Sequence, residues 1–211
     1  TIPSGSTLGI FGRTGSGKST LLALLARVYN PPKGSISIDG IDITKIDLDA
    51  WRSEMTLVPQ TAFLFSESLK DNVMLASNDE AQFTRAVADA SLTQDLASLA
   101  NGVDTLVGEE GLTLSGGQRQ RVAIARALMR KPNLLLLDDV LSAVDHETEH
   151  QLIDAFHARG GATKVIVSHR TSALQRADNI VVLDEGALVD QGTHSELISR
   201  PGIYQDAWSA Q

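Results

Sequence analysis

A glycine-rich segment near the start of the chain has the residue types and spacing of a phosphate-binding loop. It matches the pattern G-x-x-x-x-G-K-[ST] and comprises Gly12, Arg13, Thr14, Gly15, Ser16, Gly17, Lys18 and Ser19, with Thr20 as a further candidate contact. Glycines let successive backbone N–H groups turn toward phosphate oxygens, and a following helix adds its positive N-terminal end. We expect Lys18 to neutralise the β- and γ-phosphates of a nucleoside triphosphate and the Ser19 hydroxyl to bind Mg²⁺. A glycine-rich turn with a solvated lysine is the plainer alternative, and the apolar strand and helical pattern on either side argue against it.

Two adjacent aspartates form a second candidate site. Asp138 and Asp139 follow the apolar run 134–137, which we expect to be a buried strand. Ligands of α/β sheets bind at the carboxyl ends of such strands, so Asp138 is well placed to orient Mg²⁺ through its water shell. The alternative is that both acids cap the next helix, but adjacent aspartates at a buried edge repel each other unless a cation is near.

The elements that must position these residues alternate along the chain. Apolar, β-rich runs at 7–11, 134–137 and 164–167 predict strands, and helical patterns at 18–29 and 147–156 follow the first two. This alternation predicts βαβ units around a mostly parallel sheet, and therefore an α/β fold.

Two antiparallel hairpins are predicted within this α/β chain. Residues 35–38 and 41–43 alternate between apolar and polar types on either side of Asp39-Gly40, which is a strong turn signal. A second hairpin is expected at 180–189, with its turn near Glu185-Gly186.

The pattern changes between about Ser66 and Leu114, where apolar residues recur at helical spacing. Those on one face are Phe83, Val87 and Ala90, and those on the next are Leu92, Leu96 and Leu99. We interpret residues 66–114 as an inserted helical subdomain.

Composition excludes several classes of protein. The 211 residues are 42% hydrophobic and 21% charged, which suits one folded domain, and the formal net charge of −8 argues against a nucleic-acid partner. There is no cysteine, so neither disulfides nor thiolate metal sites contribute. No apolar run approaches the roughly 20 residues needed to cross a bilayer, so any membrane role requires a partner or further polypeptide.

A third motif identifies a family resemblance. The segment Leu114-Ser115-Gly116-Gly117-Gln118 could be a helix start, since Ser115 suits an N-cap and the apolar stripe at 122, 125 and 128 would follow it. Together with the glycine loop, however, it makes the chain resemble the nucleotide-binding domain of ATP-binding cassette (ABC) proteins, whose signature is LSGGQ. The resemblance implies that Ser115, Gly116, Gly117 and Gln118 contact the γ-phosphate of ATP bound to an opposite subunit, and helix N-termini do bind anions.

Other motifs occur in the order that the family has them. Gln60 after Val58-Pro59 resembles the Q-loop, Ser142-Ala-Val-Asp145 the D-loop, and His169 the switch histidine. The resemblance implies that Asp139, His169 and Gln60 take part in catalysis, and that Ser19, Gln60 and Asp138 bind Mg²⁺. A lone Gln or His would more often be an ordinary surface or core residue, and the common order of six motifs supports the functional interpretation.

The resemblance covers residues 1–211 and implies the ABC ATPase fold. We expect a P-loop NTPase-type core with an antiparallel β part in residues 1–65 and 115–211, and the helical subdomain in 66–114. The stretches 64–73 and 105–109 resemble the exporter branch, in which the second one touches transmembrane domains. ATP as the nucleotide, a second cassette and transmembrane domains as partners, and a location at the cytoplasmic face of a membrane follow from the resemblance.

The sequence departs from the exporter pattern at the acid that polarises the attacking water, which is usually Glu and here is Asp139. Its carboxylate is set back by about 1.5 Å, and a misplacement of that order can cost about 10²-fold in rate. An intact signature beside a shortened acid is expected of one half of a heterodimeric exporter, with slow hydrolysis on this chain's own loop. The competing interpretation is a homodimer in which Asp139 suffices, with His169 and Gln60 compensating.

Two further departures concern the start of the chain and Glu110. Only eleven residues precede Gly12, whereas the family's adenine-stacking aromatic lies well upstream, so we expect an N-terminally truncated domain. Glu110 stands where exporters often have Arg.

A low-turnover regulatory ATP-binding module is the main alternative function. A soluble ABC ATPase acting on DNA or ribosomes ranks last, because neither coiled-coil heptads nor net positive charge is present.

Overall fold

The computed structural model describes residues 1–75, 77–108 and 114–210. The chain divides into two compact units. The first unit contains Thr1–Leu57, Pro132–Asp139 and Gly161–Gln211, and the second contains Val58–Lys131 and Val140–Gly160. The predictions about Glu109 and Glu110 lie outside the described residues.

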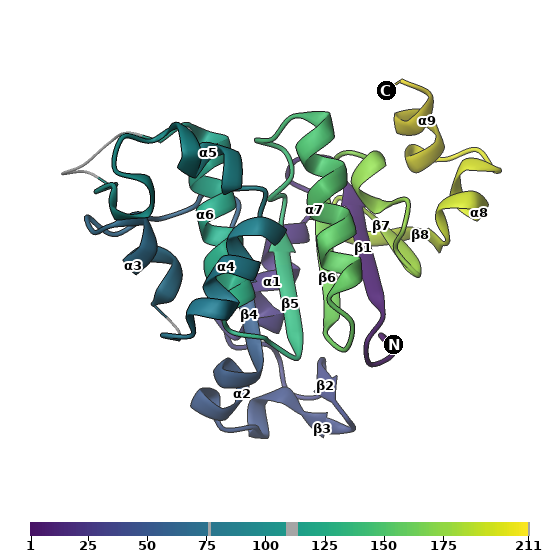
Figure 1. Cartoon of the computed structure of the whole chain (residues 1–211). Helices are drawn as coiled ribbons and strands as arrows, with labels where there is room; N and C mark the ends of the chain where they lie inside the picture. The colour runs from purple at the N-terminus through teal and green to yellow at the C-terminus, as the bar shows by residue number, and fades with distance from the viewer. Residues whose placement is uncertain (76, 109–113, 211) are drawn as a thin grey trace. The chain divides into compact units, whose positions relative to one another are not determined.

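The first unit is built on a six-stranded sheet in the order β4-β5-β6-β1-β7-β8. Its strands are β1 (Thr7–Gly12), β4 (Met55–Val58), β5 (Leu134–Asp138), β6 (Thr163–Ser168), β7 (Asn179–Asp184) and β8 (Ala187–Gly192). Strand β1 pairs in parallel with both β6 and β7, and β5 pairs in parallel with β6, as Figure 1 lets the reader follow. Strand β8 pairs with β7 in the antiparallel direction. The predicted mostly parallel α/β sheet is confirmed.

Helices and a small hairpin complete the first unit. They are α1 (Lys18–Leu25), β2 (Ser37–Ile38), β3 (Ile41–Asp42), η1 (Ile43–Lys45), α2 (Leu48–Glu54), η3 (Ser172–Leu174), α8 (His194–Ile198) and α9 (Ile203–Ser209). The β2–β3 hairpin is antiparallel as predicted, and both of its turn residues, Asp39 and Gly40, have positive φ. Its second strand ends earlier than expected, because the Asp42 carboxylate accepts the Thr44 N–H at 2.9 Å and starts the 3₁₀ turn η1.

The core of the first unit joins the parallel strands to α1 and α2. Ile10, Leu136 and Val165 come from three neighbouring strands and pack in one cluster with Leu22 and Trp51 from the helices. Burial of each such side chain contributes roughly 1.5–3 kcal/mol. The Trp51 indole N–H donates to the Leu25 carbonyl at 2.9 Å, so its polar atom is satisfied as well. This packing holds α1 against the sheet and fixes the loop that precedes it.

The second unit is helical. It contains α3 (Leu69–Met74), α4 (Glu80–Asp89), α5 (Thr93–Ser98), η2 (Gly102–Asp104), α6 (Gly116–Met129) and α7 (His146–Ala158). Helices α3 and α4 both pack on α6, and α4 also contacts α7 (Figure 1). Phe83, Val87 and Ala90 are buried on one face as expected, whereas Leu96 and Leu99 are only half-buried.

Polar side chains cap the C-terminal end of α6 in this unit. The buried Gln82 amide donates to the Met129 carbonyl at 2.7 Å, and Arg159 donates to the Leu128 carbonyl at 2.8 Å while it pairs with Asp89. These donors satisfy carbonyls that a helix end leaves without an intrahelical partner. None of the helices in the ranges 1–75, 77–108 and 114–210 is long and apolar enough to cross a membrane.

Candidate functional site

The glycine loop joins β1 directly to α1 in the first unit. Gly17 is the N-cap of α1 with φ 94°, and Gly15 also lies in the left-handed region with φ 86°. A Cβ at Gly12 would lie 2.3 Å from the Leu183 carbonyl oxygen on the adjacent strand β7, so only glycine fits there. No side chain caps the first turn of α1, so its N–H groups remain directed at the loop. The local geometry is that of an anion-binding helix start.

The Lys18 ammonium group lies over the loop. Its Nζ donates to the Gly12 carbonyl at 2.8 Å and to the Arg13 carbonyl at 2.7 Å, and stands 3.4 Å from the Ser16 hydroxyl. Burial lowers the pKa of Lys18, and the nearby charges of Asp139 and Asp138 act in the opposite direction. A cation is therefore held where the loop would receive phosphate oxygens.

Ser19 and Asp138 meet at the end of β5. The Ser19 hydroxyl donates to the Asp138 carboxylate at 3.0 Å. Burial raises the pKa of Asp138 and the Asp139 charge adds to this, while the Ser19 hydrogen bond and the Lys18 charge lower it. A cation beside the carboxylate would offset the cost of burying its charge.

These two oxygen ligands fit Mg²⁺. Mg²⁺ is commonly held by one or two protein oxygens together with substrate phosphates and water, so it needs no dedicated cage. Accordingly, the described residues contain no cluster of three or more His, Asp or Glu that could hold a metal by themselves.

Asp139 and His169 are brought together from adjacent strands. Asp139 follows β5 and His169 follows β6, and the Asp139 N–H donates to the Val167 carbonyl at 3.0 Å. The His169 Nδ1 lies 3.0 and 3.1 Å from the two Asp139 carboxylate oxygens. The Asp139 side chain is 11% exposed, whereas that of His169 is 51% exposed. The pair thus joins a buried carboxylate to an accessible imidazole. The Asp139 backbone has φ 49°, which lies in the left-handed region.

Gln60 and the signature residues belong to the second unit. Gln60 is exposed directly after Pro59, whose carbonyl accepts a hydrogen bond from the Gln120 amide at 3.0 Å. Ser115 caps α6 in a reciprocal pair with Gln118, because the Ser115 Oγ accepts the Gln118 N–H and the Gln118 Oε1 accepts the Ser115 N–H. The N-cap interpretation of Ser115 therefore holds locally.

Glycine in the signature also has a packing reason. A Cβ at Gly117 would lie 2.7 Å from the Ala143 carbonyl oxygen, so this helix start lies directly against the stretch 142–145. Two of the expected motifs are thus in contact within the second unit.

Residues that the sequence analysis did not single out support the signature. The Asp95 carboxylate accepts the Gln118 amide at 3.0 Å and forms an ion pair with Arg121 at 2.6 Å. Asp95 is 23 residues from Gln118 in the sequence and belongs to no motif. The contact between them is therefore evident only in the folded second unit.

The two exporter-like stretches pair with each other. Ser68 and Leu106 form an antiparallel bridge, and the Leu69 N–H donates to the Thr105 carbonyl at 2.9 Å. Asn72, which is buried, donates from its amide to the Phe65 carbonyl at 3.0 Å and accepts the Phe65 N–H at 2.9 Å.

Arg126 of α6 holds this pair in place, although it belongs to no motif of the sequence. Its guanidinium donates to the Asn72 carbonyl and side chain, each at 2.8 Å, and to the Phe63 carbonyl at 3.0 Å. Burial lowers the pKa of Arg126. Beside it, Phe63, Phe65 and Leu106 are 65%, 45% and 59% exposed.

Comparisons with known proteins identify relatives over the whole chain. A family model described as ABC transporter matches residues 1–142. A probable multidrug resistance ABC transporter ATP-binding/permease protein of Bacillus subtilis is 44% identical over 214 residues, covering 100% of this chain and 37% of that protein. An ATP-dependent lipid A-core flippase of Alcanivorax borkumensis is 41% identical over 207 residues, covering 96% of this chain and 36% of that protein.

The fold has a similar counterpart among solved structures. A bacterial Atm1-family ABC exporter with ATP bound matches with a TM-score of 0.94 and 39% identity, covering 100% of this chain and 38% of that one. The chain thus spans little more than a third of the length of these relatives. Because the family model matches more than half of the sequence and the α/β fold agrees with that of the exporter, the chain belongs to the ABC transporter family, in which it is an ATP-binding domain.

Proposed function

We propose that the chain binds and hydrolyses ATP and thereby powers export of a substrate across a membrane. One observation carries the proposal: the loop ammonium of Lys18, the Ser19–Asp138 pair and the Asp139–His169 pair all lie at the carboxyl ends of neighbouring parallel strands. This edge is where α/β sheets bind their ligands. The matched relatives, among them a lipid A-core flippase and a probable multidrug resistance transporter, support the exporter class.

The chain's own residues divide the work of hydrolysis between them. Loop amides of residues 12–20 and Lys18 bind the phosphates, while the Ser19 hydroxyl and the Asp138 carboxylate would hold Mg²⁺. The metal supplies positive charge to the transferring phosphoryl group. Asp139 orients the attacking water and accepts its proton. His169 positions Asp139, because its Nδ1 lies within hydrogen-bond distance of both carboxylate oxygens.

Hydrolysis on this loop is proposed to be slow. Asp139 stands where exporters carry Glu, so its carboxylate is one methylene closer to the backbone. The His169 Nδ1 lies 3.0 Å from this carboxylate. The proposed assembly is a heterodimer, in which Ser115, Gly116, Gly117 and Gln118 complete a competent site on a different cassette. The capped α6 start supports this role, because its remaining N–H groups form an anion site. The competing arrangement is a homodimer in which Asp139 suffices for ATP hydrolysis.

The other proposed partners are transmembrane domains, with the cassette at the cytoplasmic face of the membrane and without a nucleic-acid partner. The exposed Phe63, Phe65 and Leu106 support this, because they form an apolar surface on the paired exporter-like stretches. Asn72 and Arg126 anchor the backbone beneath it. Such a surface is suited to burial against another protein.

The test compares the matched heterodimer with single-site variants. The proposal predicts that removing the partner's glutamate abolishes most ATPase activity, whereas changing Asp139 to Asn has a small effect. Full turnover after the partner's glutamate is removed would overturn the heterodimer assignment. Purified chain that hydrolyses ATP alone, with a squared dependence on its concentration, would favour the homodimer.

A regulatory module with little turnover is the second candidate, and Asp139 is the observation that favours it. In that case bound ATP stabilises the dimer and is hydrolysed slowly or not at all. A single-turnover assay separates the two functions: conversion of bound ATP within seconds to minutes supports the ATPase, and bound ATP that stays intact supports the module.

A further inference from the structure

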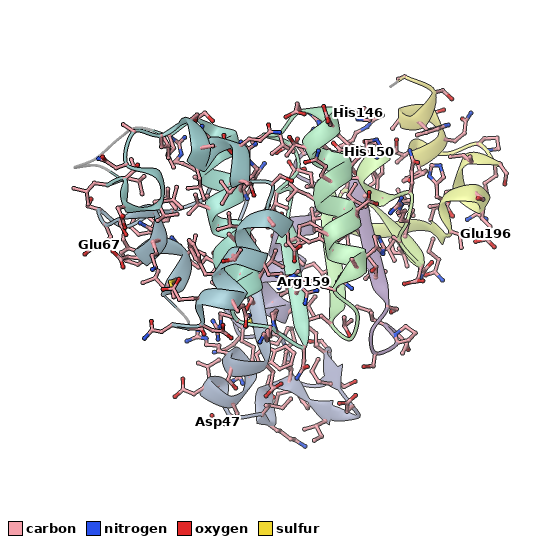
Figure 2. All side chains as sticks on the ribbon, viewed as in Figure 1. Asp47, Glu67, His146, His150, Arg159 and Glu196 are labelled. Atoms are coloured by element: carbon pink, nitrogen blue, oxygen red, sulfur yellow. The ribbon has the colours of Figure 1, made fainter. Side chains whose placement is uncertain are left out.

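Two histidines lie side by side at the start of α7, directly after the stretch 142–145. His146 is the first residue of α7 and His150 follows one turn later, so both project from the same face of the helix (Figure 2). Their Nε2 atoms are 3.1 Å apart, and the rings meet edge to face with centroids 4.4 Å apart. Both residues are exposed. Among the described residues, each ring has the other as its hydrogen-bond partner.

The separation of the two nitrogens matches the span of a metal ion. Zinc binds imidazole nitrogen at about 2.0–2.1 Å, so two ligands at an angle between about 90° and 109° have nitrogens roughly 2.9–3.4 Å apart. The observed 3.1 Å falls within this range. A cation could therefore replace the shared hydrogen bond without a change in this separation, once each ring turns its Nε2 lone pair toward the ion.

We propose that His146 and His150 form a two-ligand site for a late first-row divalent cation, namely Cu²⁺, Ni²⁺ or Zn²⁺. Imidazole suits these ions, whereas Mg²⁺ prefers oxygen ligands, so the site is chemically distinct from the one at Ser19 and Asp138. The described residues provide no third His, Asp or Glu in a metal-binding cluster, so water completes the coordination. Binding is therefore exchangeable and weaker than at a structural zinc site.

The protons and the surrounding charges are compatible with this site. In the hydrogen-bonded pair one neutral ring donates its Nε2 proton to the other, and on metal binding that proton moves through solvent to Nδ1 of the same ring. Both Nε2 lone pairs then face the cation. Asp145 and Glu147, at the N-cap and in the first turn of α7, add negative charge beside the site. They offset the positive helix N-terminus, which would otherwise repel a cation.

Isothermal titration of the untagged protein tests the site. The titration uses Zn²⁺ and Ni²⁺, without nucleotide and with excess Mg²⁺ present to occupy oxygen sites. We expect one cation per chain and a loss of affinity of at least tenfold in His146→Gln and in His150→Gln. His157→Gln, on the same helix but outside the pair, is the matched control and should bind as the parent does. Far-UV circular dichroism checks that each variant remains folded.

The Cu²⁺ electron paramagnetic resonance spectrum provides a second readout. Hyperfine splitting from two nitrogens is expected in the parent and from one nitrogen in each single variant. Equal affinity in the parent and both variants would overturn the proposal. A loss in the His157→Gln control as large as that in the variants would overturn it as well.

Discussion

Replacing Asp139 by Glu tests whether the length of this acid limits turnover. In the structure the Asp139 carboxylate lies 3.0 and 3.1 Å from the His169 Nδ1, and the side chain is 11% exposed. One added methylene moves the carboxylate about 1.5 Å further from the backbone. Since a misplacement of about 1 Å at a reacting centre costs on the order of 10²-fold, we expect Asp139→Glu to raise kcat by up to about 100-fold in the heterodimer that lacks the partner's glutamate.

The same substitution should lower stability. Asp139 has φ 49°, a left-handed conformation that Asp adopts more readily than longer side chains. We expect the free energy of unfolding to fall by about 1 kcal/mol in Asp139→Glu. A gain in rate together with a loss in stability separates this mechanism from a general improvement in folding.

Steady-state ATPase rates at saturating MgATP, measured beside urea unfolding curves, check both expectations. Asp139→Asn is the matched control, because it keeps the shape and removes the charge, and it should not share the gain. A folded Asp139→Glu chain whose kcat is equal to or below that of the parent would refute the reasoning about reach.

Three further predictions concern the fold that supports the site. Gly12→Ala places a Cβ 2.3 Å from the Leu183 carbonyl oxygen and should cost about 1–3 kcal/mol in urea unfolding, whereas Gly160→Ala, which meets nothing within 4 Å, should be nearly neutral. Asn72→Ala removes the buried side chain that pairs with the part-buried Phe65 N–H and carbonyl and should cost about 1–3 kcal/mol, and an unchanged melting temperature would contradict this. The Thr44 and Gly34 hydrogen bonds hold the pKa of Asp42 below its ordinary value of 3.8, so its stabilisation is complete above that value and is lost as the pH falls through the lowered folded-state pKa. Asp42→Asn should flatten this part of the acid unfolding profile.

Local sequence patterns predicted the parts of the site that depend on neighbours in the chain. The glycine loop is set by the strand before it and the helix after it, and the structure has β1 and α1 at those positions. The Asp39-Gly40 turn and the Ser115 cap are likewise local, and both are present.

Contacts that depend on strand register were beyond the sequence. Asp139 and His169 are 30 residues apart, and they meet because β5 and β6 pair with Asp138 opposite Val167. The need for glycine at position 12 likewise arises from the pairing of β1 with β7, which places Leu183 opposite it. Such pairings are decided by burial across the whole sheet rather than by any local pattern.

The helical region shows the same limit. Helical spacing predicted the buried face of α4 at Phe83 and Val87 correctly, because that face packs on α6. It did not distinguish Leu96 and Leu99, which have the same spacing but remain half-buried. Periodicity indicates which side chains could share a face, and the partner helix decides which of them are covered.

The central claim is that the loop of residues 12–19 binds the phosphates of a magnesium nucleotide. Titration of the folded chain with MgATP, followed by calorimetry, tests it most directly, with Lys18→Ala as the variant. Saturable binding that weakens by at least tenfold in Lys18→Ala is the predicted result, because the Lys18 ammonium donates to the Gly12 and Arg13 carbonyls of the loop. The absence of saturable binding by the parent chain, or equal affinity in the variant, would contradict the account.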